Sequence, residues 1–179
     1  MTTITPGTYA IDASHSEVGF NVRHAGIAKV HGSFAEFEGS IVVAENATDS
    51  KANVSVELAS IDTRSAQRDE HLRSADFFNV AVTPKMTFAT TGVAIGGGNE
   101  FTLTGDLTLN GVTRSVEIEA EYEGAAVDPY GQQRIAFSGK AEINRKDFGL
   151  TWNAVLETGG VLVSDKIVLE FDVSAIKQA

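Results

Sequence analysis

Apolar and polar residues alternate along most of this chain, as they do in strands that bury one face. The clearest example is residues 101–109, in which phenylalanine and leucine alternate with threonine and aspartate. Asn110 and Gly111 follow, and this pair favours the type I′ turn of a hairpin, whose two central residues need positive φ. Residues 116–122 then alternate apolar residues with glutamates. The pattern predicts a hairpin with one apolar face and one acidic, solvated face.

The same alternation recurs from one end of the chain to the other. Further strands are predicted at residues 8–12, 17–24, 32–44, 53–58, 85–94, 134–143 and 161–173. Turn-forming residues separate these segments, above all at 96–99 and 128–131. The glycines of 96–99 lack the strand-to-helix context of a phosphate-binding loop, so we predict that they form a hairpin tip.

Residues 64–78 break this pattern and carry no strand signal. They gather three arginines with aspartate and histidine, and they end on two phenylalanines. The interior favours a helix that Thr63 or Ser65 can cap, and Ser74 can cap a second short turn. A dense polar cluster that leads into aromatic residues, inserted into a β-type chain, is where chemistry or recognition is expected.

One short helix among many antiparallel strands predicts a closed barrel or a sandwich. The mostly hairpin-linked order favours a barrel, and about eight strands leave room inside for side chains or one ligand. At 179 residues the chain is most simply one domain, residues 1–179. We therefore expect an all-β, extended antiparallel barrel with one helical insert at about residues 64–78.

The composition narrows the possible partners. Hydrophobic residues make up 42% of the chain and include ten phenylalanines, which is ample for a core. The formal net charge of −10 argues against nucleic acid, because neutralising phosphates needs a basic face. It equally disfavours docking on an anionic membrane through a polybasic patch. No run approaches the ~18 apolar residues of a membrane span.

The location is expected to be cytoplasmic. The first residues contain neither the basic nor the apolar region of a signal peptide. The chain has no cysteine, so disulfides give no information about the compartment. We expect a soluble protein of the cytoplasm, with a periplasmic or secreted location as the alternative.

The four histidines, His15, His24, His31 and His71, invite a metal-binding interpretation. No two of them have the spacing of a metal-ligand pair, and no thiolate is present to complete a zinc set. If residues 15–24 form one continuous strand, His15 and His24 point to opposite faces. We therefore expect no metal site.

Catalysis by His15 and Ser16 is also disfavoured. Neighbouring residues on a strand point apart, and the chain has no Gly-x-Ser-x-Gly elbow. Hydrogen bonds from Asp12, Ser14 or Ser16 to the local backbone are the favoured interpretation.

His24 shares a face with the apolar residues before it. It is predicted to be either a buried histidine bonded to a carbonyl or a ligand contact at the end of an apolar lumen.

The charged residues of the insert allow two interpretations. Arg64 and Arg68 stand four apart on one helical face, with His71 in the next row. They could clamp an anionic head group through charge-assisted hydrogen bonds. Equally, they could pin a capping helix to the barrel through pairs with Asp69, while the aromatic pair plugs the lumen. Arg145 lies in a second segment where polar residues lead into an aromatic one, and it could reach Asp69 or Asp76.

Several short motifs occur in order over nearly the whole chain. The insert contains Arg68-Asp69-x-His71-Leu72-x-Ser74-x-Asp76-Phe77-Phe78. The others are Ile11-Asp12 with His15-Ser16, Phe20-Asn-Val-Arg-His24, Val30-His-Gly32 with Phe34, Pro84-Lys-Met-Thr-Phe88, Gly105-Asp106-Leu107-Thr108-x-x-Gly111-Val112-Thr113 and Ile143-Asn144-Arg145-x-Asp147-Phe148-Gly149. With these motifs the chain resembles the YceI-like, polyisoprenoid-binding family.

The resemblance implies an extended, lipocalin-like antiparallel barrel whose tunnel-like lumen holds a long apolar chain. The ligands it implies are a polyprenyl diphosphate, an isoprenoid quinone or a fatty-acyl amphiphile. The chain departs from the family at Tyr9, where a tryptophan is usual, which is a mild aromatic exchange. An alternating barrel can bury such a chain, and polar groups at one mouth would select the head group.

We therefore hypothesise a non-enzymatic bacterial protein that binds, stores or transports a long-chain isoprenoid or similar amphiphilic lipid, with no other cofactor. The residues predicted to line the apolar tunnel are Phe20, Val22, Phe77, Phe78, Phe88, Leu103, Leu107, Phe137 and Trp152. Those predicted to make polar contacts near a mouth are His24, Arg64, Arg68, His71 and Arg145. An enzyme with a histidine base and a structural domain with a self-filled core are the alternatives. A homodimer is the default expectation for assembly.

Overall fold

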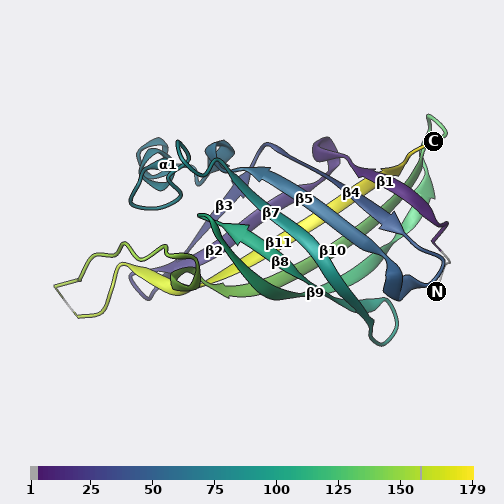
Figure 1. Ribbon diagram of the computed structural model, residues 1–179. Coiled ribbons are helices and arrows are strands. Elements are labelled where there is room, and N and C mark those ends of the chain that lie inside the picture. The colour runs from purple at the N-terminus through teal and green to yellow at the C-terminus, as the bar shows by residue number, and fades with distance from the viewer. Residues whose placement is uncertain (1–3, 158) are drawn as a thin grey trace.

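Antiparallel pairing joins the strands into one sheet that closes on itself (Figure 1). The computed structural model describes residues 4–157 and 159–179. The strands are β1 (Gly7–Ile11), β2 (Glu17–His24), β3 (Ala28–Phe34), β4 (Phe37–Val43), β5 (Lys51–Glu57), β6 (Ile61–Asp62), β7 (Lys85–Ile95), β8 (Glu100–Leu109), β9 (Val112–Val127), β10 (Gln133–Asn144) and β11 (Val163–Lys177). The α-helix is α1 (Ala66–Arg73), and the short 3₁₀ helices are η1 (Ala13–His15), η2 (Ala47–Asp49), η3 (Leu58–Ser60) and η4 (Arg145–Phe148).

The eleven strands of the described residues follow eight paths around the barrel. β2 and β1 lie in line along β11, with β2 beside its first part and β1 beside its last residues. In the same way β3 and β4 share one path, and β6 and β5 share the next. Because β1 pairs with both β4 and β11, the sheet closes. The predicted all-β, lipocalin-like barrel of about eight strands is confirmed.

Strands β8 and β9 form the predicted hairpin. Asn110 and Gly111 at its turn have φ of 53° and 72°, as a type I′ turn requires. The register pairs Leu103 with Ile118, so the apolar residues of both strands share one face. β9 extends beyond the predicted 116–122 because its pairing with β8 and β10 continues after the alternation has ended.

Residues 32–44 form two strands, β3 and β4, rather than the one predicted. Ala35 and Glu36 lie between them, and their N–H groups donate to the Ser60 carbonyl and hydroxyl at 3.2 and 3.0 Å. These bonds replace ladder hydrogen bonds, so the strand bends at this point. A contact with η3, distant in sequence, therefore sets a break that the local pattern does not contain.

His31 lies in strand β3, followed there by Gly32. Gly32 is required because of the packing on the neighbouring strand. A Cβ atom at this position would lie 2.3 Å from Cζ of Phe20 on the paired strand. The glycine therefore makes room for an aromatic ring that packs flat against the sheet.

The insert is helical only over α1. Its N-cap is Ser65, whose hydroxyl accepts from the backbone N–H of Arg68 at 3.4 Å. At its other end Ser74 donates its N–H to the His71 carbonyl, and the chain then folds back so that the Phe78 N–H reaches the Leu72 carbonyl at 2.9 Å. The predicted helix and its serine caps are confirmed, with the last residues of 64–78 forming turns.

The barrel has two different ends (Figure 1). We call the end that carries α1 and η4 the insert end. We call the end that carries the β4–β5 connection (residues 44–50) and the β7–β8 turn (residues 96–99) the mouth end. The larger buried cluster includes Leu58, Ile61, Leu109, Phe148 and Leu150 and lies toward the insert end. A smaller cluster of Tyr9, Tyr122, Ile135 and Ala175 lies toward the mouth end.

Candidate functional site

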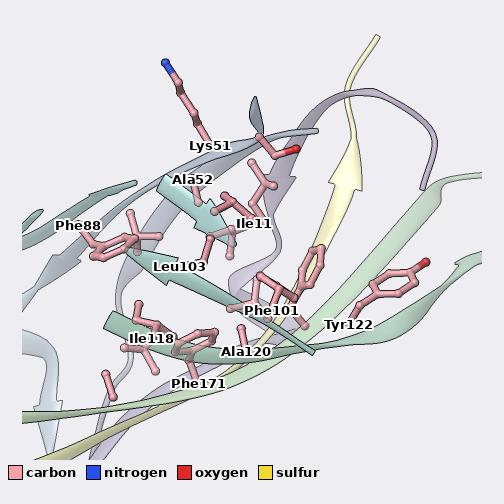
Figure 2. Close-up of a pocket in the computed structure, with 18 of the residues that line it drawn as sticks. Ile11, Lys51, Ala52, Phe88, Phe101, Leu103, Ile118, Ala120, Tyr122 and Phe171 are labelled. Atoms are coloured by element: carbon pink, nitrogen blue, oxygen red, sulfur yellow. The ribbon is translucent and has the colours of Figure 1, made fainter. Parts of the chain in front are cut away.

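A cavity of about 450 Å³ runs inside the barrel, and residues of both core clusters line it (Figure 2). Its volume lies in the range of roughly 300–1,000 Å³ that is usual for sites of small molecules. The wall is apolar along most of its length, and its members include Phe88, Phe101, Leu103, Ile118, Phe137 and Phe171. Alternation places these side chains inside, because inward and outward positions alternate along every barrel strand.

The cavity reaches solvent at the mouth end. Exposed lining residues come from the β4–β5 connection and the start of β5, namely Glu45, Ala47 and Lys51, and from the β7–β8 region, namely Ile95, Asn99 and Glu100. Toward the insert end, packed side chains fill the barrel, and Leu58 and Phe148 are 0% and 1% exposed there. The arrangement is a tunnel that is accessible at the mouth end and filled at the insert end.

Four of the nine predicted tunnel residues line the cavity: Phe88, Leu103, Leu107 and Phe137. Phe88 lies against Gly105 of β8, where a Cβ atom would approach the ring to 2.3 Å. Phe137 contacts Phe101 edge-on, with ring centroids 5.7 Å apart. The alternating pattern thus placed these side chains on the correct face of the sheet.

The structure places the other five elsewhere. Phe20 and Phe78 both contact Phe34, with ring centroids at 5.8 and 6.2 Å, and pack against the larger core cluster. Val22 is paired with Ile167 and Val30 near the end of β2, toward the insert end. Phe20 and Val22 share the inner face of β2, and Phe78 belongs to the turns after α1, but none of the three lines the cavity.

Phe77 and Trp152 form an aromatic cluster with His71. The His71 ring meets Phe77 and Trp152 edge-on at 5.2 and 4.7 Å, and the two larger rings are 5.3 Å apart. Nε2 of His71 lies 2.9 Å from Oδ2 of Asp76. The cluster ties α1 to the segment after η4, so His71 is held by protein groups at the insert end.

The arginines of the insert bind its own backbone. Arg68 donates to the Thr63 hydroxyl and carbonyl at 2.8 and 2.6 Å. Asp69 is buried and accepts from the N–H and hydroxyl of Thr63 at 2.9 and 2.5 Å. Arg73 donates to the carbonyls of Ala59 and Ile61 at 2.8 and 3.2 Å. The geometry matches the pinning interpretation, with Thr63 and carbonyls as partners in place of the expected Arg–Asp pairs.

Arg64 and His24 are exposed. Arg64 adopts a left-handed conformation with φ of 64°, and its N–H donates to Oδ1 of Asp62 at 2.8 Å. His24 ends strand β2 opposite Ala28 and Val163, also toward the insert end. Neither side chain faces the cavity, and ligand contact by the five predicted polar residues stays a prediction.

Arg145 is buried and 2% exposed. It donates to the carbonyls of Leu150, Trp152, Ser164 and Val163 at 2.6, 2.9, 3.0 and 3.3 Å. Burial lowers the pKa of Arg145, and Asp165 at 3.6 Å acts in the opposite direction. The expectation that it reaches Asp69 or Asp76 is wrong, because its fork instead ties together the two ends of the loop between η4 and β11.

The residues around His15 hydrogen-bond to one another and, through Asp12, to the local backbone. Asp12 caps η1 by accepting from the Ser14 N–H at 3.1 Å, and its Oδ2 lies 2.8 Å from both His15 Nδ1 and Arg134 Nη1. The Ser14 hydrogen bond, followed by that of Arg134, holds the pKa of Asp12 well below its usual range. Arg134 also donates to Asp128 at 2.8 Å, so the group joins the β1–β2 bend to the β9–β10 turn.

Two general features of the described residues concern metals and membranes. Within 4–157 and 159–179, no group of three histidine, cysteine, aspartate or glutamate side chains could hold a metal ion. None of the helices in those ranges has the length and apolar character needed to cross a bilayer.

Tyr122 is a site residue that sequence reasoning placed on the apolar face of β9 but did not single out. It lines the cavity, is 8% exposed and contacts Phe137 at 5.6 Å. Among the described residues its hydroxyl is buried without a hydrogen-bond partner. Burial raises the pKa of Tyr122, so the hydroxyl stays protonated. The alternating pattern predicts the face on which Tyr122 lies, but only the packing reveals that its hydroxyl is unpaired.

An eight-stranded antiparallel barrel around an apolar cavity defines a lipocalin-like β-barrel. The model of the YceI-like domain matches residues 9–175, and the chain therefore belongs to the YceI-like family. It is 43% identical to Protein YceI of Escherichia coli O157:H7 over 145 residues, which are 79% of this chain and 75% of that protein.

Solved structures share the fold. BcnA of Burkholderia cenocepacia superposes with a TM-score of 0.81 at 21% identity, covering 92% of this chain and 98% of that one. A polyisoprenoid binding domain from Saccharophagus degradans superposes with a TM-score of 0.73 at 16% identity, covering 97% of this chain and 100% of that one. At these identities the two likenesses concern the fold alone.

Proposed function

We propose that this protein binds one long-chain isoprenoid, a polyprenyl diphosphate or an isoprenoid quinone, or a similar amphiphilic lipid, inside the barrel, and stores or carries it without chemical change. The observation that carries the proposal is the apolar cavity of about 450 Å³ that opens at the mouth end. Membership of the YceI-like family and the polyisoprenoid binding domain of Saccharophagus degradans, which has the same fold, support it.

The shape of the cavity favours a chain over a compact ligand. Its lining extends along β7 from Met86 to Ile95. At about 3.3 Å per residue this spans about 30 Å of strand, or roughly 20–25 Å of barrel axis for the usual strand tilt. We place the apolar tail toward the filled insert end and the polar end of the lipid near the mouth.

Burial energetics explain why the ligand must be long. Each buried methylene contributes about 0.8 kcal/mol, so ten of them contribute about 8 kcal/mol before costs. Association loses roughly 4–15 kcal/mol of translational and rotational freedom. A chain of fewer than about ten buried carbons would therefore bind weakly on this scale, and a long isoprenoid would bind firmly.

Native mass spectrometry of gently purified protein, followed by organic extraction, tests the proposal. We expect a long-chain lipid to copurify. Leu103→Trp, which fills the lumen, should remove most of it, whereas Thr104→Trp, at the next position on the outer face of β8, should not. Wild-type protein that yields no such lipid and takes up no added isoprenoid would contradict the proposal.

A homodimer and a cytoplasmic location are further proposals, independent of the lumen. Analytical ultracentrifugation measures the first, and cell fractionation with an antibody to the native chain measures the second. A monomer at micromolar concentration, or a signal confined to the periplasmic fraction, would contradict them.

A further inference from the structure

We infer that the lumen selects lipids whose polar end is uncharged and carries an oxygen atom, such as a quinone or an alcohol, and disfavours a diphosphate. The inference rests on the proposed function and narrows it to one class of head group. Two independent observations support it: the charges around the mouth and the unpaired hydroxyl of Tyr122.

Acidic residues surround the mouth. Glu45 and Glu100 belong to the cavity lining, and Asp49 lies on η2, in the same β4–β5 connection as Glu45. Glu100 is also paired directly with Glu121 across β8 and β9. Like charges on one rim produce a negative potential at the entrance, and this potential repels an anionic head group.

Few cations are available to offset these charges. Among the lining residues that the structure describes, Lys51 is the only cation, and Figure 2 shows its side chain extending away from the apolar wall. Arg134, at the same end of the barrel, is bound by Asp12 and Asp128 at 2.8 Å each. Lys177 of β11 also lies at this end, against Gly7 of β1, but it does not line the cavity. Tight recognition of a diphosphate uses several convergent cations, and the cavity lining that the structure describes has one.

The arginines that could bind a diphosphate lie at the other end. Arg68, Arg73 and Arg145 bind backbone groups around the insert and η4. The buried clusters there fill the barrel. A diphosphate at that end would have to displace these bonds as well as enter a packed core.

Tyr122 supplies a partner for an uncharged oxygen. Its hydroxyl is buried, unpaired within the described residues and protonated, since burial raises its pKa. Nearly all buried polar groups in native proteins have a hydrogen-bond partner, so an orphan group marks a place where one is expected. Tyr122 lies in the cluster toward the mouth end, on the same face of β9 as Ala120 of the cavity wall. The ring of Tyr122 lines the wall, and its hydroxyl is covered by neighbouring side chains, so a carbonyl or hydroxyl oxygen of a lipid accepts from it once these side chains move aside.

Two C20 probes with the same chain test the charge argument: geranylgeraniol and geranylgeranyl diphosphate. Competition against a fluorescent lipid should give at least about tenfold tighter binding of the alcohol at low salt, with the difference shrinking as salt screens the rim. The double substitution Glu45→Lys and Glu100→Lys should tighten diphosphate binding at least about fivefold and change alcohol binding much less, because the alcohol carries no charge.

The matched control makes the same change in charge away from the mouth. Glu70→Lys with Glu157→Lys alters two exposed residues, one on α1 and one in the loop after η4, and should leave both affinities as in the wild type. Equal or tighter binding of the diphosphate by the wild type, or no effect of the mouth substitutions, would overturn the inference while leaving the proposed function standing. If neither probe binds and no lipid copurifies, the proposed function itself fails.

Tyr122→Phe isolates the hydroxyl. It should weaken geranylgeraniol binding about 2- to 10-fold, as loss of one hydrogen bond does, and leave binding of the corresponding C20 hydrocarbon unchanged. Thermal stability should not fall, because the hydroxyl has no protein partner in the described residues. Unchanged affinity for the alcohol, or a marked loss of stability, would contradict the role of Tyr122.

Discussion

The two ends of the barrel use polar residues in opposite ways. At the insert end charged side chains are numerous, and Arg68, Asp69 and Arg145 make their hydrogen bonds within the protein. At the mouth end the cavity wall is apolar, and the Tyr122 hydroxyl has no partner among the described residues. A dense polar cluster therefore marks where irregular backbone is held in place, and a single unpaired polar group marks where a ligand is expected.

The contrast has a physical cause. The insert and η4 leave the sheet, so their carbonyl groups lose the ladder partners that strands provide. Buried backbone groups must be paired, and an arginine offers five donors in a fixed fork. At the mouth end Arg134 makes one such clamp, to Asp12 and Asp128, but the strands of the cavity wall are paired with their neighbours and leave few backbone groups to satisfy.

The largest expected effect comes from removing Arg145. Arg145→Ala removes a donor from four carbonyls, of which that of Val163 keeps another, Asn153 Nδ2, and it should lower the free energy of unfolding by about 3 kcal/mol or more. Chemical denaturation measures this. Lipid affinity of the folded fraction should not change, because the side chain does not line the cavity. A loss below about 1 kcal/mol would contradict the clamping role.

Gly105→Ala affects the cavity wall instead. The new Cβ atom would lie 2.3 Å from Cζ of Phe88 and 2.6 Å from the Ala89 carbonyl, so the backbone must shift and the ring must move. We expect a loss of about 2 kcal/mol in stability together with weaker lipid binding. Gly97→Ala, where a Cβ meets nothing within 4 Å, is the control and should change neither. If G105A binds lipid with wild-type affinity, this part of the cavity wall does not belong to the binding site.

Asp69→Ala tests whether the hydrogen bonds of Asp69 hold the insert in place. It leaves the buried N–H and hydroxyl of Thr63 without their acceptor and should cost about 1–2 kcal/mol. Glu70→Ala changes the exposed neighbour and should stay within about 0.5 kcal/mol of the wild type. Equal effects of the two substitutions would show that Asp69 does not hold the insert. Lipid affinity should be unchanged in both.

The smallest expected effect is on thermal stability at acid pH. The pKa of Asp12 is lower in the folded protein than in the unfolded chain, so its stabilising contribution is complete above the unfolded value of about 3.9 and is lost as the pH falls below it. Thermal melts of the wild type and Asp12→Asn should therefore differ by about 2–4 °C at neutral pH. The difference should shrink as the pH falls below about 3.9 and vanish only below the lowered pKa of the folded state. A difference that persists unchanged in acid would show that the Asp12 carboxylate charge is not responsible.

Most of the fold could be predicted from the pattern of the chain. Alternation identified the β8–β9 hairpin and the inner face that carries Phe88, Leu103, Leu107 and Phe137. Alternation gives the face of a strand but not the position along the barrel axis. Phe20 therefore has the correct face and yet packs on Phe34, because the position of the filled region depends on contacts among several strands.

The polar part of the site was less predictable. The arginines of residues 64–78 resemble a binding cluster in sequence because their partners, backbone carbonyls, leave no mark in the pattern. Arg145 shows the same difficulty, since its partner Val163 is 18 residues away. Tyr122 was visible as one more apolar-face residue, but its unpaired hydroxyl arises only when β9, β10 and β1 pack around it.

Photo-crosslinking tests most directly the claim that a lipid lies in the lumen with its polar end at the mouth. The probe is a C20 isoprenoid that carries an uncharged photoreactive carbonyl group at its polar end, and mass spectrometry of the digested protein locates the adducts. The account predicts adducts within residues 44–52, 93–101 and at Tyr122. Adducts concentrated in residues 64–78 and 145–152 would contradict it, because they would place the polar end at the insert.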